Sequence, residues 1–336
     1  VLCYNILMDI KQNLPLSNFT TMRLGGNARF IAEAHDSKSV RALVLSAKKH
    51  DIPFYVLGGG SNVIARDEGY KGLVVVNRIK GIERTDEADG NVLFKIGAGE
   101  VWDDFVKMVV ADDLIGVEAM SGIPGTCGAA PVQNVGAYGQ EVADTLVELE
   151  AYDSQTDEFV VLKNEDCGFE YRHSIFRGSE AGRYVITSIT LRLAKGIPAP
   201  PFYKALQDYF DERMMSIYDT QAVRDAVLDI RGSKLPDPNK FPNSGSFFKN
   251  AIVEEWQLQA VRKEYPDVPS YEMGDGKYKI PTGWMIERTG LKGALLHGMR
   301  VNKDNCLVLI NESASSYKQL ANARGEIMTA VRTKFN

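Results

Sequence analysis

Hydrophobic positions in the first part of the chain form short continuous runs separated by one stretch of helical spacing. Residues 30–31, 54–57 and 73–76 are apolar runs, and residues 37–50 carry Val, Leu and Ala at helical spacing. This order predicts a strand, a helix and a strand, with a further strand after the glycine-rich turn that follows residue 57.

The middle of the chain is dominated by alternating apolar and polar residues, which are typical of strands with one solvated face. The predicted elements are a strand at 92–96, a helix at 102–110, a hairpin of 147–151 with 159–162, and a strand at 185–193. A proline-rich segment, residues 195–201, then resembles a linker.

Helical spacing returns in the last third. It predicts helices at 220–231, 253–265, 283–289 and 317–331, together with a buried strand at 306–310. The segment Lys234-Leu235-Pro236-Asp237-Pro238 cannot continue a helix because proline removes a backbone donor, so a boundary near Gly232 is expected. A chain of 336 residues is long for one core. We therefore expect three domains, residues 1–80, 81–232 and 233–336.

Composition and charge narrow the possible partners. Hydrophobic residues make up 44% and charged residues 25%, as in ordinary globular proteins. The net charge of -5 comes without a basic block, which argues against a nucleic-acid partner. An anionic ligand would need a local cluster of donors.

The cysteines Cys3, Cys127, Cys167 and Cys306 are widely spaced, which predicts neither a zinc site nor a disulfide framework. We expect no metal site. The apolar opening, residues 1–8, is short and lacks a preceding basic residue, and no run of about 18 apolar residues follows. These features predict a cytoplasmic protein without membrane insertion.

Two glycine-rich segments are candidates for ligand binding. Gly58, Gly59, Gly60, Ser61 and Asn62 follow a predicted strand, and successive backbone N–H groups there can converge on an anion. A tight turn is the equal alternative. The pattern Gly-x-Gly-x-x-Gly is absent at this turn, so a Rossmann dinucleotide site is not indicated.

Residues 121–139 form the densest such segment, with five glycines and two prolines. This composition fixes an irregular backbone that could pass close to a flat cofactor, while Gln133 and Asn134 offer amide groups. We favour a ligand role over a purely structural loop.

Polar groups in two further segments could act on an anionic substrate. Arg172 lies among aromatic residues and can bind a carboxylate at two points, although taken alone it reads as an ordinary surface cation. His173 is a weak catalytic candidate. Ser246, between Gly245 and a Phe-Phe pair, could donate a proton; a turn leading into the core is the alternative.

Taken in order, these segments resemble the UDP-N-acetylenolpyruvoylglucosamine reductases, the MurB family of flavoenzymes in bacterial cell-wall precursor synthesis. The resemblance rests on an ordered set rather than on one motif. Its members are Thr20-Thr21 with Gly25-Gly26, then 58–62, 123–139, 171–176, 234–238 and 245–250.

The resemblance implies an α+β fold: a two-domain FAD-binding fold of the vanillyl-alcohol oxidase type, followed by a third α+β domain that binds substrate. FAD would lie between the first two domains, with its diphosphate on residues 58–62 and its isoalloxazine along 123–139. The implied cofactor residues are Gly58, Gly59, Gly60, Ser61, Asn62, Ile123, Gly125, Gly128, Ala129, Ala130, Gln133, Asn134, Gly136 and Tyr138.

The implied reaction reduces FAD with NADPH and then transfers hydride from FAD N5 to C3 of an enolpyruvyl UDP-sugar. Ser246 would protonate C2, and Arg172 would stabilise the charge that builds on C2 and the carboxylate. Tyr203 matches a tyrosine of the longer, type I subtype. The implied substrate residues are Tyr203, Lys234, Lys249 and Asn250. Only small-molecule partners and a monomer are expected.

Two departures qualify the resemblance. The family carries a catalytic glutamate in a segment just after the final helix, where this sequence stops, so we expect that segment to have been truncated or omitted. Glu326 precedes it on the final helix and reads as a solvated charge. Asn302 stands where the family often has histidine. Two alternatives stay open: another FAD oxidoreductase of the same fold, and a noncatalytic sensor of flavin or nucleotide sugar.

Overall fold

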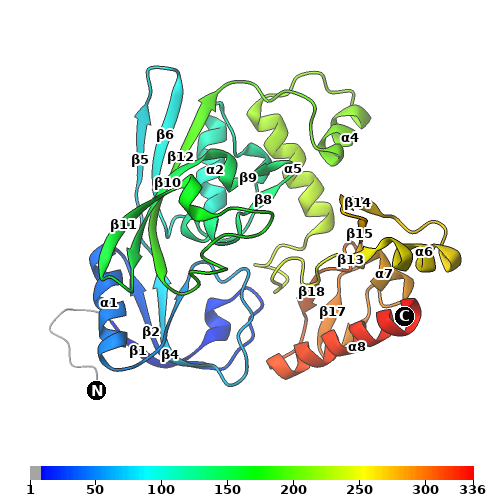
Figure 1. Cartoon of the computed structure of the whole chain (residues 1–336), viewed down its shortest axis with the longest axis horizontal. Coiled ribbons are helices and arrows are strands. Elements are labelled where there is room, and N and C mark those ends of the chain that lie inside the picture. The colour runs from blue at the N-terminus through cyan, green and yellow to red at the C-terminus, as the bar shows by residue number, and fades with distance from the viewer. Residues whose placement is uncertain (1–8) are drawn as a thin grey trace. The chain divides into compact units, whose positions relative to one another are not determined.

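The computed structural model describes residues 9–336, which form a mixture of helices and strands (Figure 1). The expectations for residues 1–8, including Cys3, lie outside the described residues. The chain divides into two compact units. The first unit comprises the chain up to Pro15, Asn27–Gly60 and Gly69–Arg231; the second comprises Leu16–Gly26, Ser61–Glu68 and Gly232–Asn336.

The first sheet of the first unit has the strand order β1-β2-β4-β3, in which β2, β4 and β3 are parallel and β1 is antiparallel to β2. Helix α1 begins after Asp36, whose carboxylate accepts the N–H of Ser39 at 2.7 Å, and it buries one apolar side in the core shared with these strands. The bounds are β1 (Lys11–Pro15), β2 (Asn27–Ala34), α1 (Ser37–Lys49), β3 (Phe54–Leu57) and β4 (Tyr70–Asn77). This arrangement places Gly58 directly after the carboxyl end of β3.

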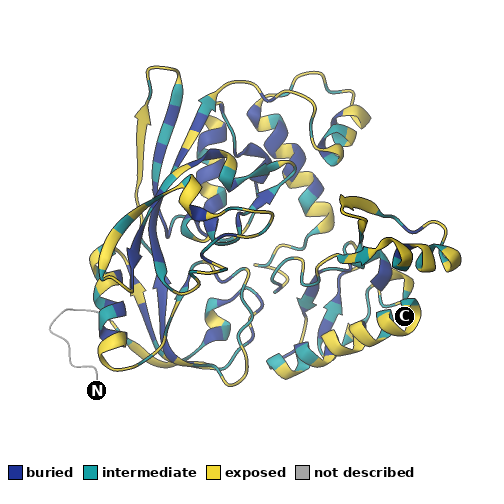
Figure 2. Cartoon of the chain, viewed as in Figure 1, coloured by how far each residue is buried: buried dark blue, intermediate teal, exposed yellow. Residues whose placement is uncertain are grey.

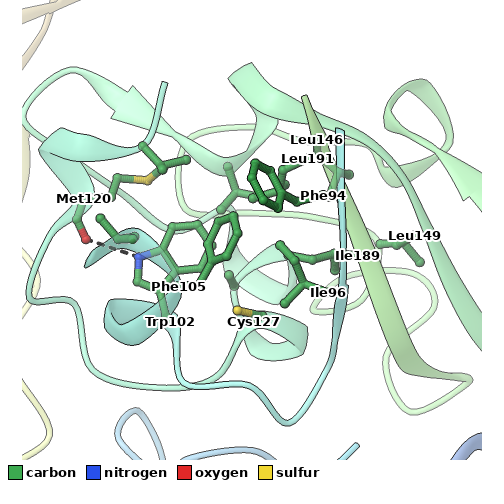
Figure 3. Packing of buried hydrophobic residues seen from close by; sticks show 14 of the residues in the cluster. Phe94, Ile96, Trp102, Phe105, Met120, Cys127, Leu146, Leu149, Ile189 and Leu191 are labelled. Atoms are coloured by element: carbon green, nitrogen blue, oxygen red, sulfur yellow. Dashed lines mark hydrogen bonds between the residues drawn. The ribbon is translucent and has the colours of Figure 1, made fainter. Parts of the chain in front are cut away.

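The second sheet is antiparallel, with the order β11-β10-β12-β6-β5 and β7 paired to β12. Figure 3 shows its core, where the rings of Phe94 and Phe105 meet edge to face at 5.5 Å beside Trp102. The bounds are β5 (Ile82–Asp86), β6 (Asn91–Gly97), α2 (Trp102–Ala111), β7 (Leu114–Ile115), β10 (Leu146–Asp153), β11 (Glu158–Lys163) and β12 (Tyr184–Lys195).

The strands and hairpin predicted for this sheet are present, with two differences. Val147 is exposed although alternation assigned it to the buried side, because the pairing of β10 with β12 shifts register between Leu146 and Glu148. Strands β5 and β7 were not predicted, since all residues of β5 are exposed without an apolar face and β7 is only two residues long.

Short elements follow in the first unit, and the proline-rich segment leads into two helices. Their bounds are η2 (Glu118–Met120), η3 (Cys127–Ala129), η4 (Pro131–Gln133), β8 (Gly136–Ala137), β9 (Gln140–Glu141), α3 (Val142–Thr145), η5 (Asn164–Cys167), α4 (Lys204–Glu212) and α5 (Thr220–Lys234). Helix α5 continues past its predicted end at residue 231 and stops at Lys234, two residues before Pro236.

The second unit contains two small antiparallel sheets, β13-β15-β14 and β16-β17-β18, the α-helices α6, α7 and α8, and the short 3-10 helix η1. Helix α8 buries Leu320, Ala323 and Ile327 on one side and exposes the other (Figure 2). The bounds are η1 (Leu16–Phe19), β13 (Ala251–Glu254), α6 (Glu255–Glu264), β14 (Tyr271–Gly274), β15 (Lys277–Ile280), α7 (Thr282–Arg288), β16 (Leu295–Leu296), β17 (Met299–Val301), β18 (Leu309–Asn311) and α8 (Tyr317–Phe335).

The core of the second unit draws on segments far apart in sequence. Met22 and Leu24 are buried together with Ile286 and the buried side of α8. The carboxylate of Asp67 accepts the first N–H groups of α8, so that it satisfies donors that the helix itself leaves unpaired.

Two predicted elements of the second unit begin later in the structure than predicted. The helix predicted at 253–265 begins only at Glu255, because residues 251–254 pair with β15 as β13. The strand predicted at 306–310 is shorter: β18 starts at Leu309, and Val308 forms an isolated bridge with Ser246.

Between residues 9 and 336 no helix is long and apolar enough to cross a membrane. Within the same part of the chain, no three His, Cys, Asp or Glu side chains are grouped so that they could hold a metal ion.

Candidate functional site

The glycine-rich turn after β3 packs against the second glycine-rich segment. A Cβ on Gly58 would lie 2.6 Å from Thr126 Oγ1, and one on Gly59 would lie 3.0 Å from the Cα of Gly125. Side chains at these two positions would force the segments apart, so glycine is required for the backbones to approach. The two motifs singled out in the sequence are therefore neighbours within the first unit.

This turn fits an anionic group. The N–H groups of Gly59 and Gly60 donate to no acceptor within residues 9–336, and Gly60 is buried with a left-handed φ of 65°. Thr126 Oγ1 is likewise buried without a partner in the described chain. Buried donors are normally paired, so the N–H of Gly60 and the hydroxyl of Thr126 call for an acceptor such as a phosphate oxygen, while Gly59, between Gly58 and Gly60, is exposed. Ser61 and Asn62 continue the turn as the start of a second-unit segment.

The second glycine-rich segment is irregular, as its composition predicted. Asn134 and Tyr138 are left-handed, with φ of 46° and 49°. A Cβ on Gly128 would lie 2.3 Å from Ala98 Cβ, so this glycine is fixed by close packing against the end of β6. The remaining predicted cofactor residues lie along the same segment: Ile123, Gly125, Ala129, Ala130, Gln133 and Gly136.

The start of this segment is clamped by residues that the sequence patterns did not single out. Asp103, in the first turn of α2, accepts two hydrogen bonds from Arg224 of α5 at 2.6 and 2.9 Å. The same carboxylate accepts the N–H of Gly122 at 2.6 Å, and Arg231, two turns along α5, donates to the carbonyl of Gly122 at 3.0 Å. Both polar groups of the Gly122 residue are thus held by charged side chains.

Burial and pairing set the charge states of this clamp. Burial alone would raise the pKa of Asp103, but hydrogen bonds from Arg224 and from the N–H of Gly122 outweigh it and hold the pKa below its usual value. Burial lowers the pKa of Arg231, opposed by Tyr138 and Asp103. Arginine nevertheless stays protonated, so the clamp consists of two cations and one anion.

Arg172 joins the Tyr171–Phe176 segment to the second glycine-rich segment. Its guanidinium donates to the carbonyls of Asn134, at 3.4 Å, and Gly136. Ser174 adds a hydrogen bond to the carbonyl of Val132 at 2.7 Å. Two motifs that are separate in the sequence therefore lie side by side, and Arg172 retains further N–H donors, since a guanidinium carries five.

The side chain of Asn134 is fully buried and bonded to the protein backbone. Its amide donates to the carbonyl of Glu170 at 3.3 Å, and its oxygen accepts the N–H of Ala143 at 3.0 Å. Asn134 therefore shapes the segment through these bonds. His173 is exposed, and its backbone pairs with that of Glu170.

Tyr203 lies at the end of the proline-rich segment, immediately before α4. The residue is 56% exposed, and its ring meets that of Tyr138 edge to face with the centroids 5.9 Å apart. This contact places a predicted substrate residue beside a predicted cofactor residue within the first unit. Burial raises the pKa of Tyr138, so its hydroxyl remains protonated at neutral pH.

In the second unit, Asn243 fixes the turn that presents Ser246. Its amide donates to the carbonyls of Pro236 and Phe241 at 3.0 and 2.7 Å, and its oxygen accepts the N–H of Gly245 at 2.9 Å. Gly245 is left-handed, with φ of 74°, which glycine adopts at little cost. Asn243 itself was not predicted, although an Asn two residues before a Gly is a turn signal.

Ser246 is exposed, and its hydroxyl has no hydrogen bond within the described chain. Its backbone pairs with that of Val308, and Phe247 then donates its N–H to Leu307 at 2.7 Å. Phe247 and Phe248 pack on the second-unit core, as the Phe-Phe pair predicted. The serine is thus a free hydroxyl on a firmly held backbone.

The other predicted second-unit residues lie near chain turns. Lys249 is exposed, and Asn250 accepts the N–H of Thr282 at the start of α7 at 3.2 Å. Lys234 is exposed at the end of α5, and its carbonyl accepts from buried Asn302 at 3.3 Å. Glu326 is half exposed and lies 3.2 Å from His297.

Two protein-family models match separate parts of this chain. Residues 28–162 match a family model described as an FAD binding domain, and residues 237–336 match one described as the UDP-N-acetylenolpyruvoylglucosamine reductase C-terminal domain. Together these matches and the mixed helices and strands confirm the predicted α+β fold class, with an FAD-binding domain followed by a C-terminal domain.

Two similar relatives carry the same name, UDP-N-acetylenolpyruvoylglucosamine reductase. The Ralstonia nicotianae protein is 37% identical over 96% of this chain and 94% of its own length. The protein of Neisseria meningitidis serogroup A is 40% identical over 94% of this chain and 92% of its own length. A solved structure, that of the reductase MurB from Thermus caldophilus, is 20% identical, covers 96% of both chains and has a TM-score of 0.67.

Proposed function

Because the chain belongs to the family of UDP-N-acetylenolpyruvoylglucosamine reductases, we propose that it reduces UDP-N-acetylglucosamine enolpyruvate to UDP-N-acetylmuramate with FAD and NADPH. This step belongs to peptidoglycan precursor synthesis. The observation that carries the proposal is similarity at 33–40% identity along nearly the whole chain, including both the FAD-binding and the C-terminal domain. Its partners would be small molecules.

Bound FAD would supply hydride transfer, and the turn after β3 would hold its diphosphate. Three features support this placement: the unpaired N–H groups of Gly59 and Gly60, the absence of side chains at Gly58 and Gly59, and the irregular 123–139 segment packed against them. Successive backbone N–H groups in such a turn form a concavity that binds anions.

Arg172 would bind the substrate carboxylate and stabilise the negative charge that develops beside it. Its two bonds to backbone carbonyls fix the guanidinium in place, while its other N–H donors stay available. Such a fixed cation can lower a barrier by several kcal/mol (about 3) when it is paired with developing charge.

Ser246 would donate a proton to C2 of the reduced enolpyruvyl group. A hydroxyl that is free of protein partners on a fixed backbone suits this role, since no internal bond must break before transfer. Tyr203, Lys234, Lys249 and Asn250 would bind the sugar nucleotide. These residue roles follow from the family resemblance and stay predictions.

Replacement of Ser246 by alanine separates the two half-reactions. We expect Ser246→Ala to reduce FAD with NADPH at the wild-type rate but to slow reoxidation by the enolpyruvyl substrate at least about 100-fold, the usual contribution of a positioned acid. Anaerobic stopped-flow absorbance of the flavin follows both steps. Ser244→Ala, two residues earlier in the same turn, is the matched control.

Equal slowing of both half-reactions would refute the proton-donor role. A wild-type protein that carries FAD but is not reoxidised by the enolpyruvyl substrate would refute the proposed reaction itself, and would favour another flavin oxidoreductase or a noncatalytic flavin-binding protein.

A further inference from the structure

Only two side-chain polar atoms in the described chain are buried without a hydrogen-bond partner: Thr126 Oγ1 and Ser46 Oγ. An unpaired buried hydroxyl destabilises the fold, because it has lost water and gained nothing in exchange. Such groups in a native protein call for a specific explanation.

Thr126 lies where the two glycine-rich segments touch. Its backbone is fixed: its carbonyl accepts the N–H of Ala129 at 3.0 Å, and the residue forms a bridge with Val101. Its hydroxyl alone lacks a partner, and it faces Gly58, on which a Cβ would lie only 2.6 Å away. The unpaired hydroxyl therefore adjoins the turn whose Gly59 and Gly60 N–H groups also lack acceptors.

Ser46 has no comparable setting. It lies within α1, outside both glycine-rich segments, and its carbonyl is 2.9 Å from His50 Nδ1. The two unpaired hydroxyls thus share the same burial and differ in their surroundings, which makes Ser46 a matched control.

We propose that Thr126 is a further cofactor-binding residue, whose hydroxyl donates a hydrogen bond to a diphosphate oxygen of FAD held by the Gly58–Asn62 turn. This inference rests on the proposed function. A threonine hydroxyl carries one rotatable donor, and a phosphate oxygen is a strong acceptor. Gly58 covers the hydroxyl in this structure, so pairing requires the turn to shift away from Thr126, and consecutive glycines provide that freedom.

One substitution at Thr126 should make the flavin-free protein more stable and at the same time weaken its binding of FAD. Thr126→Val keeps the shape and removes the hydroxyl. It should raise the melting temperature of the flavin-free protein by a few degrees (about 2 to 4 °C), because an unpaired buried group is gone. It should also raise the Kd for FAD about tenfold, because a charge-assisted hydrogen bond is lost.

The assays are thermal unfolding of the flavin-free protein and titration with FAD, followed by quenching of flavin fluorescence. Thr126→Ser retains the hydroxyl and should bind FAD within about threefold of wild type. Ser46→Ala should raise the melting temperature in the same way and leave the Kd unchanged.

An unchanged Kd in Thr126→Val, with or without a rise in melting temperature, would overturn the proposal, as would a lowered melting temperature of the flavin-free variant, since the hydroxyl would then have a structural role. Should the valine variant not fold, Thr126→Ser and Thr126→Ala differ only in the hydroxyl, and equal Kd values for that pair would overturn the proposal as well. Failure of the wild-type protein to bind FAD would instead refute the proposed function.

Discussion

Removal of the negative charge at Asp103 tests whether its pair with Arg224 holds the start of the 123–139 segment. The side chain of Arg224 is 8% exposed and that of Asp103 is 32% exposed. Asp103→Asn keeps the size of the side chain but leaves a buried guanidinium without a counter-charge, which typically costs about 3 kcal/mol or more. Arg224→Met leaves a carboxylate that water can reach, and we expect a smaller loss of about 2 kcal/mol, the usual contribution of hydrogen bonds to a charged group.

The pair also predicts strong coupling between the two substitutions. In the double variant no charge is left unpaired, so it should lose less stability than the two single variants combined, with a coupling free energy of about 1.5 kcal/mol or more. Urea unfolding of the flavin-free protein, followed by circular dichroism, measures all three values. Asp208→Asn, in the exposed pair of Lys204 with Asp208, is the control and should change stability by no more than about 0.5 kcal/mol.

Acid should remove this contribution. The pKa of Asp103 lies below its ordinary value in the folded chain, so its carboxylate stabilises the fold above the unfolded value of about 3.9. That stabilisation disappears as the pH falls through the lower folded pKa. The unfolding free energies of wild type and Asp103→Asn should therefore converge below about pH 4. Additive single substitutions, or a difference between the two proteins that is independent of pH, would refute the clamp.

Two further substitutions test the residues around the candidate site. Tyr203→Ala should raise KM for the enolpyruvyl substrate about tenfold and leave reduction by NADPH unchanged, because the half-exposed side chain beside Tyr138 would contact the sugar nucleotide. Steady-state kinetics, with Tyr203→Phe as the control, measures this KM, and an unchanged value would contradict the prediction. Asn243→Ala removes three hydrogen bonds that fix the Gly245 turn, so it should destabilise the protein by about 2 to 4 kcal/mol and slow the reoxidation of the flavin. Chemical unfolding measures the first effect and stopped-flow absorbance the second. Reoxidation at the wild-type rate in a folded variant would show that the turn does not position Ser246.

Local patterns in the sequence predicted most of the elements and the segments of the candidate site. The glycines at 58 and 59 predicted an anion-binding turn or a tight turn, whereas their close packing against Thr126 and Gly125 was not predicted, because it joins segments far apart in the sequence. The Asp103–Arg224 pair could not be predicted in this way, because each residue reads as an ordinary helix charge and 121 positions separate them. Strand β5 could not be predicted, because it pairs with β6 through its backbone while all of its side chains are exposed, so its sequence shows no apolar pattern.

The discontinuous second unit also constrains the order in which the chain can fold during synthesis. Met22 and Leu24 are made early, but the residues that bury them, such as Ile286 and Leu320, come some 260 or more positions later. The carbonyl of Met22 likewise accepts a hydrogen bond from the side chain of Asn311, which lies 289 positions further along the chain.

Contacts of such separation are slow to form, because a long loop must close before they contribute. The strands of the first unit can pair during translation, but residues 16–26 and 61–68 cannot be buried in the core of the second unit until α8 has been synthesised. The turn after β3 continues directly into the segment Ser61–Glu68, so the last residues of the turn should be among the last parts of the protein to become fixed.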